Sequence, residues 1–208
     1  MLWMADDVLA WCYSQRTTAI EGNQGSGKTL LAFELARYLL LKEDRELRYL
    51  ISNVACDFAD DITDVVPREG KYLDCVIVFD EIGKFLNKSN IMLANNLVAD
   101  LRKLNCVLLM PSRNETNKEL RQHVIEPAMN FGVFGIDAIY YKAWLDRRSS
   151  KNKTSFLFTG TSEIKGHYDS DEVVEDSQGI IPWLLETKKQ IALEQGEIKQ
   201  KKKVVYMS

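Results

Sequence analysis

The chain has 208 residues, of which 46% are hydrophobic and 27% are charged, and these values are ordinary for one globular domain with a sizeable core. The formal net charge of −3 excludes a globally basic surface of the kind that attracts nucleic acid. Any contact with nucleic acid must therefore come from a local cluster of basic side chains.

The cysteines and the first residues of the chain bear on the cellular compartment. No CxxC pair is present and no histidine stands at metal-ligand spacing, so we interpret the cysteines as buried thiols in a reducing interior. They are Cys12, Cys56, Cys75 and Cys106. Residues 1–15 contain Asp6 and Asp7 and no basic region, so they do not form a signal peptide. No apolar run approaches the ~20 residues of a membrane span, and we expect an intracellular, soluble protein.

The first predicted elements lead into and out of a glycine-rich stretch. Residues 3–15 place apolar side chains mostly on one face at helical spacing and predict a short packing helix. Residues 17–23, TTAIEGN, are a β-branched run that ends in glycine and predict a strand. A helix rich in leucine and alanine is expected at 28–43, and a second strand at 47–55.

The middle of the chain predicts two buried strands and a helix between them. Residues 73–83, LDCVIVFDEIG, are a continuous apolar run that ends in two acids, which is typical of a buried parallel strand. A helix follows at 92–105, and another buried strand, CVLLMPSR, at 106–113. The acidic segment at 56–70 precedes them. Its aspartates lack calcium-loop spacing, so we interpret it as a solvated acidic surface rather than a metal site.

The last third of the chain changes character. Residues 136–148 and 153–160 flank the turn-like SSKN and predict an antiparallel hairpin, and residues 180–203 predict a helix with a basic end. The alternation of strands and helices predicts an α/β fold: a doubly wound, mostly parallel sheet with helices on both faces and a C-terminal antiparallel hairpin. We expect one domain at 1–180, followed by a C-terminal helix and basic tail at 181–208.

A phosphate-binding loop stands between the first strand and its helix. Residues 22–29, GNQGSGKT, fit GxxxxGK[ST], in which glycines let successive N–H groups turn inward around the β-phosphate. Lys28 reaches the β/γ oxygens, Thr29 coordinates Mg²⁺, and the helix N-terminus adds its positive end. We therefore predict a site for ATP and Mg²⁺. Its ATP-binding residues are Gly22, Asn23, Gln24, Gly25, Ser26, Gly27, Lys28, Thr29 and Leu30.

The two acids that end the run VIVFDE indicate what happens to the nucleotide. Asp80 is the carboxylate expected at the end of a neighbouring strand, where it holds the magnesium. Glu81 follows it, and a hydrolase benefits from a carboxylate that polarises water, whereas a kinase of small molecules needs none. We therefore favour an ATPase in which the Glu81 carboxylate activates the attacking water. The alternative is that Glu81 caps a helix or forms a salt bridge.

The order of motifs resembles the FtsK/HerA superfamily of DNA-pumping motors over residues 17–175. After the Asp-Glu strand come a helix ending in ADLRKLN, the strand CVLLMPSR and the segment NETNKELRQHV, as in that superfamily. The later segment GHYDSDEVV looks like the Tyr-Asp-Thr-x-Glu segment of several members. One departure is that members usually have a glutamine where this chain has PSR.

The resemblance implies roles for further residues. Members follow the fourth strand with a polar sensor residue and then a short helix bearing an arginine. Here the sensor role falls to Ser112 or Arg113. Arg121 is the first choice, and Arg113 the second, for an arginine that reaches the γ-phosphoryl group of the next subunit. The resemblance also implies that Tyr168 contacts ATP.

The viral branch of the superfamily includes genome-packaging ATPases and the zonular-occludens-toxin-like assembly proteins of filamentous phages. The resemblance implies an ATP-hydrolysing motor that packages double-stranded viral DNA into a preformed capsid. It further implies a homo-oligomeric ring such as a hexamer, contact with capsid vertex proteins, and a place in the host-cell cytoplasm or with the virion.

Other functions stay open at this point. One is a phage assembly ATPase, although such proteins usually add a membrane-spanning segment. Another is a nucleotide switch or small-molecule kinase that does not act on DNA, and a third is a capsid or scaffold component that merely binds ATP. Stimulation of ATP turnover by DNA would separate the motor from a switch or a kinase.

A motor needs basic side chains for the DNA phosphates, and two clusters offer them. One flanks the hairpin turn and consists of Lys142, Arg147, Arg148, Lys151 and Lys153. The other lies in the tail and consists of Lys199, Lys201, Lys202 and Lys203. We favour the turn, because a short loop held by two strands can transmit a movement that a frayed tail cannot.

Overall fold

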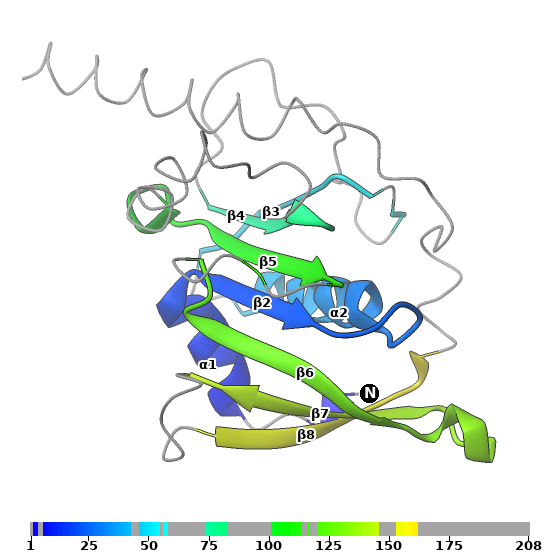
Figure 1. Cartoon of the computed structure of the whole chain (residues 1–208). Coiled ribbons are helices and arrows are strands. Elements are labelled where there is room, and N and C mark those ends of the chain that lie inside the picture. The colour runs from blue at the N-terminus through cyan, green and yellow to red at the C-terminus, as the bar shows by residue number, and fades with distance from the viewer. Residues whose placement is uncertain are drawn as a thin grey trace, which may run out of the picture.

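A single sheet runs through the part of the chain that the computed structural model describes (Figure 1). The described residues are 2–3, 6–42, 46–54, 56–57, 74–82, 101–113, 116, 120–145 and 153–161. The strands are β1 (Leu2–Trp3), β2 (Thr17–Glu21), β3 (Tyr49–Ser52), β4 (Cys75–Val78), β5 (Val107–Ser112), β6 (His123–Asn130), β7 (Ala138–Trp144) and β8 (Lys153–Thr159). The helices are α1 (Asp6–Gln15), α2 (Lys28–Leu40) and the short 3-10 helix η3 (Phe131–Phe134).

The sheet has eight strands in the order β1-β8-β7-β6-β2-β5-β4-β3. From β6 to β3 the neighbouring strands run parallel, and beyond β6 the strands β7, β8 and β1 continue the sheet antiparallel. The predicted α/β sheet, mostly parallel with an antiparallel hairpin, is therefore confirmed. Because parallel strands end at the same edge, the residues that follow β2, β4 and β5 meet although they are distant in sequence.

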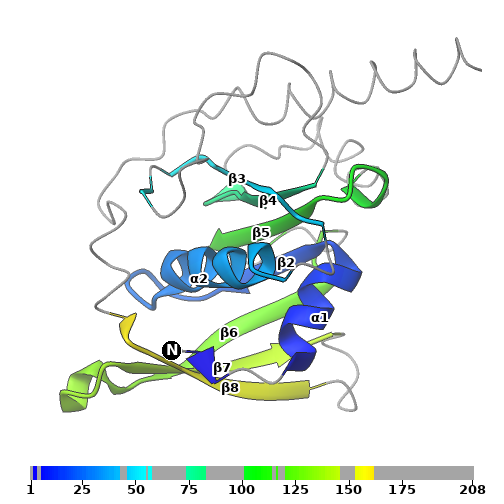
Figure 2. The ribbon, with the colours of Figure 1, turned by 180° about the vertical axis from the view of Figure 1, so that it is seen from behind.

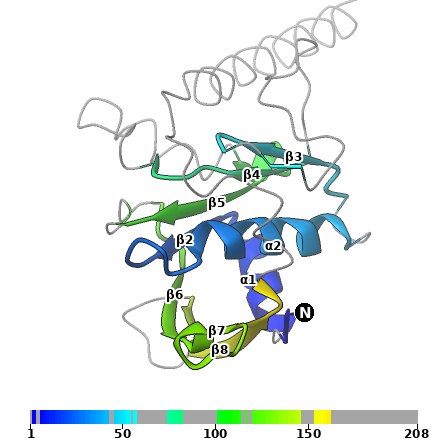
Figure 3. The ribbon, with the colours of Figure 1, turned by 90° about the vertical axis from the view of Figure 1, so that its right-hand side faces the viewer.

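Two apolar clusters cover the two faces of the sheet. Helices α1 and α2 pack together on one face (Figures 2 and 3). On the other face the described cover includes Leu101, which is helical, and Leu104. Strand β5 alternates between them, since Leu109 packs with the helices and Leu108 packs on the opposite side. Burial on both faces explains why these strands are continuous apolar runs in the sequence.

The first residues depart from the predicted helix at 3–15. Helix α1 begins at Asp6, whereas Leu2 and Trp3 form strand β1. In β1, Leu2 pairs with Phe158 and Trp3 with Leu157 of β8. Strand β8 would otherwise present an open row of backbone donors and acceptors, and β1 pairs with them. The spacing of Trp3 relative to the helix could not reveal this long-range pairing.

Strand β6 was not expected from the sequence. The resemblance implied a short arginine-bearing helix in this region, but Arg121 stands two residues before β6, and the described residues 120–122 are not helical. Pro127 obscures the strand because it lacks a backbone N–H, and the pairing with β7 shifts register between Pro127 and Met129. Strand β6 pairs with β2 on one side and β7 on the other, so it joins the parallel strands to the hairpin.

Several predicted features lie outside the described residues. They are most of the acidic segment at 56–70, most of the helix at 92–105, Tyr168, and the helix and tail at 181–208. Among the helices of the described part, none is both long enough and apolar enough to span a membrane.

His123, at the start of β6, is fully buried between the sheet and α1. Its Nδ1 lies 3.1 Å from the Thr18 hydroxyl and 3.6 Å from the Cys12 sulfur, and the Trp11 ring meets the imidazole edge-on. These neighbours are uncharged, so nothing among them compensates the desolvation of an imidazolium. Burial therefore lowers the pKa of His123 to about 3.

This burial predicts acid sensitivity. An unfolded chain binds the proton with a pKa of about 6.5, so the stability that is complete above that pH is lost as the pH falls toward 3, at up to about 1.4 kcal/mol per pH unit. Thermal unfolding between pH 7.5 and 5 should show a shallower loss of stability in His123→Asn than in the wild type. An identical slope in the two proteins would contradict the prediction.

Candidate nucleotide-binding site

The glycine-rich loop at 22–27 connects the carboxyl end of β2 to the first turn of α2. Its backbone is anchored at the start, where the Gly22 N–H donates to the Ser112 carbonyl at the end of β5, at 3.2 Å. Gly25 and Gly27 have φ of +73° and +82°, in the left-handed region that side chains disfavour. These torsions let the chain turn back and enter α2, whose first N–H groups point out at the loop.

The side chain of Lys28, the first residue of α2, lies across the loop. The residue is only 7% exposed, and its Nζ donates to the Asn23 carbonyl at 2.8 Å. Burial lowers the pKa of Lys28, while the carboxylates of Asp80 and Glu81 oppose that shift. A cation held across the loop by a backbone carbonyl can exchange that carbonyl for phosphate oxygens, which are stronger partners for a charge.

Thr29, in the first turn of α2, and Asp80, after β4, contact each other, although β5 lies between β2 and β4 in the sheet. The Thr29 hydroxyl donates to Asp80 Oδ2 at 2.8 Å, although the residues are 51 positions apart. Burial raises the pKa of Asp80, and the hydrogen bond from Thr29 acts in the opposite direction. A hydroxyl beside a half-buried carboxylate fits Mg²⁺, which binds oxygen atoms and completes its shell with waters and phosphates. Within the described residues there is no larger cluster of acids, histidines and cysteines for a metal.

Asn53, just after β3, holds the backbone of Asp80 in place. Its side-chain Nδ2 donates to the Asp80 carbonyl at 3.0 Å, and its Oδ1 accepts from the Asp80 N–H at 2.7 Å. The next residue, Glu81, has a φ of +53°, and its N–H donates to the Pro111 carbonyl at 2.9 Å. The turn after β4 is therefore fixed on both sides by neighbouring strands. The sequence alone did not indicate Asn53.

Arg113 follows β5 and lies against Glu81. Its Nε is 3.3 Å from Glu81 Oε1, and the two side chains are 55% and 14% exposed. The preceding Ser112 is buried, and its carbonyl accepts the loop's Gly22 N–H. Ser112 and Arg113 thus contact both the loop and the acidic turn. Their sensor role stays a prediction.

Arg121 lies beside the end of β2 from which the loop begins. Its Nη1 is 3.6 Å from Oε1 of Glu21, the last residue of β2, and the Arg121 side chain is 16% exposed. The same oxygen accepts the Thr116 N–H at 2.9 Å. Arg121 is thus held by a residue of its own chain, Glu21, which stands one residue before the loop. Action on a neighbouring subunit would require this ion pair to open, and that role also stays a prediction.

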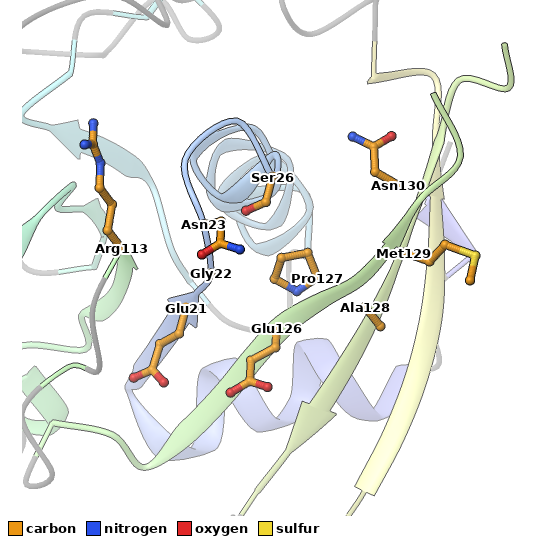
Figure 4. A pocket seen from close by; sticks show the side chains of 10 residues that line it. All are labelled: Glu21, Gly22, Asn23, Ser26, Arg113, Glu126, Pro127, Ala128, Met129 and Asn130. Atoms are coloured by element: carbon orange, nitrogen blue, oxygen red, sulfur yellow. The ribbon is translucent and has the colours of Figure 1, made fainter. Parts of the chain in front are cut away.

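A pocket of about 360 Å³ adjoins the loop (Figure 4). One wall is the loop with Asn23 and Ser26, and the other is the second half of β6. Glu21 and Glu126 line it from neighbouring strands, and Arg113 borders it. Its size suits part of a small ligand. The residues on β6 had no signal in the sequence, because they reach the loop only through the pairing of β6 with β2.

The remaining predicted ATP-binding residues fall into two groups. Gln24 and Gly25 are exposed at the tip of the loop, whereas the Leu30 side chain is fully buried in the core. Leu30 therefore offers the site only its backbone. Tyr168 lies outside the described residues.

Comparison with family models and with curated protein sequences gave no match. Among solved structures, the chain is similar to a chain in the structure of C. elegans PCH-2, with a TM-score of 0.42 and 15% sequence identity. The similarity covers 62% of this chain and 44% of that chain, so it spans less than half of the other protein's length. It is too weak to support a family or a function. The loop, the parallel sheet and the acidic turn themselves show a P-loop NTPase-like α/β fold.

Proposed function

We propose that this chain binds ATP with Mg²⁺ and hydrolyses it. The observation that carries this proposal is the 2.8 Å contact between Thr29 and Asp80, which joins the phosphate loop to the acidic turn. Lys28 neutralises the β/γ oxygens, and the hydroxyl and carboxylate hold the metal. When bound, Mg²⁺ offsets charge on the phosphates as the terminal bond breaks.

In this proposal Glu81 polarises the attacking water. It follows the metal-binding Asp80 directly, and its backbone is fixed to β5 through Pro111. Arg113 lies on the Glu81 carboxylate and is more than half exposed, so it can move to the γ-phosphoryl oxygens when ATP enters. The structural alternative is that Glu81 serves only as the salt-bridge partner of Arg113.

Replacement of Glu81 separates these two roles. Glu81→Gln should keep ATP binding and lose hydrolysis by about 10²-fold or more, because general-base help of the usual size disappears. Phosphate release and calorimetric affinity, measured on the same sample, check this. The matched control is Glu34→Gln, which removes an ion-paired carboxylate on α2, away from the site, and should leave turnover within about twofold. Unchanged hydrolysis in Glu81→Gln would support the salt-bridge role.

We further propose that the ATP energy moves double-stranded DNA, as in a ring motor that packages a viral genome in the host cytoplasm. The support is the motif order over 17–175 and the placement of basic residues. Lys153 is exposed, and its Nζ lies 5.5 Å from the centre of the Trp144 ring. These two residues bracket the hairpin turn. Arg147, Arg148 and Lys151, within that turn, lie outside the described residues.

In this proposal DNA contacts the chain near the ends of β7 and β8 that flank the turn, away from the phosphate loop. Strand β6 runs parallel to β2 and ends beside the phosphate loop, and β7 returns antiparallel, so Trp144 lies at the opposite edge (Figure 1). A polymer held there would not compete with nucleotide for space. A movement of the phosphate loop would be transmitted to the polymer through β6 and β7.

The motor predicts DNA-stimulated ATP turnover that is independent of sequence and falls steeply with salt, because contacts are to phosphates. Arg147→Ala combined with Arg148→Ala should reduce the stimulation while leaving turnover without DNA unchanged. The matched control is Lys199→Ala with Lys201→Ala, which removes the same charge from the tail. Loss of stimulation in the control instead would show that the tail, and not the turn, contacts the DNA. A wild type that binds no DNA at low salt with ATP would contradict the motor.

A further inference from the structure

The two glycines that define the phosphate loop are packed against the β6–β7 hairpin. A Cβ on Gly22 would lie 2.8 Å from Cγ of Pro127 on β6. A Cβ on Gly27 would lie 2.6 Å from Cδ1 of Ile139 and 3.0 Å from the Tyr141 hydroxyl, both on β7. The absence of side chains at these positions therefore lets the hairpin touch the loop backbone directly.

Pro127 and Tyr141 are opposite each other in the β6–β7 register. One cross-strand pair thus contacts both the first and the last glycine of the loop. The Tyr141 side chain is fully buried, and its ring stacks on Phe156 of β8 with centroids 5.3 Å apart. This packing leaves the hydroxyl little freedom. The Tyr141 hydroxyl donates to the Gly27 carbonyl at 3.0 Å.

The Gly27 carbonyl receives a second hydrogen bond, from the Leu31 N–H at 3.0 Å, which is the first helical bond of α2. The carbonyl has two lone pairs, so both are used. No cis peptide bond occurs in the described chain, and in a trans peptide the C=O and the following N–H point in opposite directions. With the carbonyl held by Tyr141 and Leu31, the Lys28 N–H is turned away from the hairpin, and as one of the first N–H groups of α2 it points out of the helix at the loop.

We propose that Tyr141 is a positioning residue for the nucleotide, acting through the Gly27–Lys28 peptide. Its hydroxyl keeps the Lys28 N–H in the orientation that donates to phosphate before the nucleotide arrives. The peptide then needs no reorientation when phosphate binds, and this preorganisation lowers the free-energy cost of binding. This inference rests on the proposed nucleotide-binding function. It also makes the β6–β7 hairpin, rather than α2 alone, the support of the loop.

Tyr141→Phe tests the inference, because it removes the hydroxyl and keeps the ring. Affinity for ATP with Mg²⁺ should fall about 3- to 10-fold, the loss expected for one hydrogen bond. The matched control is Tyr13→Phe, which removes a tyrosine hydroxyl that donates to Asn105 Oδ1 at 3.1 Å, away from the loop. The control should lower the thermal midpoint to a similar extent and leave affinity unchanged.

A second readout does not depend on nucleotide. Hydrogen exchange of the Leu31 amide, measured without ATP, should be faster in Tyr141→Phe and unchanged in Tyr13→Phe. Only the former removes one of the two bonds that hold the Gly27 carbonyl, so the peptide turns more freely and the remaining bond from Leu31 opens more often. Unchanged exchange in Tyr141→Phe would overturn the inference. So would faster exchange with wild-type ATP affinity. If the wild type binds no ATP, the proposed function fails, and the exchange result alone decides whether Tyr141 holds the peptide.

Discussion

The hydrogen bond between Thr29 and Asp80 is the contact on which the site depends. Thr29 belongs to the first turn of α2, and Asp80 follows β4, which is separated from β2 in the sheet by β5. The contact exists only because the parallel strands end at one edge and bring the loop and the acidic turn together. Asn53 fixes the Asp80 backbone from β3, so the Asp80 carboxylate is supported from both sides of β4.

The antiparallel half of the sheet supports the loop from the other side. Pro127 and Tyr141 touch its first and last glycines, while Ser112 and Asp80 hold it from the parallel half. The loop is therefore clamped between two parts of one sheet. The β6–β7 hairpin runs from the phosphate loop to the opposite edge of the sheet, where Trp144 ends β7. In the proposed motor, this shared element is the physical link between the phosphates and the DNA.

The features that the sequence predicted are those encoded in consecutive residues. The loop at 22–29, the apolar runs of β4 and β5, and the β7–β8 hairpin each carry a local pattern, and the structure has elements at those places. Asn53 and Tyr141 carry no such pattern, since their partners are distant in the chain. Pro127 hid β6, and the pairing of β1 with β8 depends on an edge that exists only in the folded sheet. Long-range pairing, rather than local propensity, decided each of these positions.

In the proposed function, Thr29 and Asp80 hold the magnesium of a bound nucleotide. Calorimetric titration of ATP, with Mg²⁺ and then with a chelator, tests it most directly in the wild type, Asp80→Asn and a Lys28→Ala reference. We expect Mg²⁺ to strengthen ATP binding by the wild type. Asp80→Asn should bind ATP equally with and without Mg²⁺, and Lys28→Ala should bind weakly in both conditions. An undiminished effect of Mg²⁺ in Asp80→Asn, or no ATP binding by the wild type, would contradict the account.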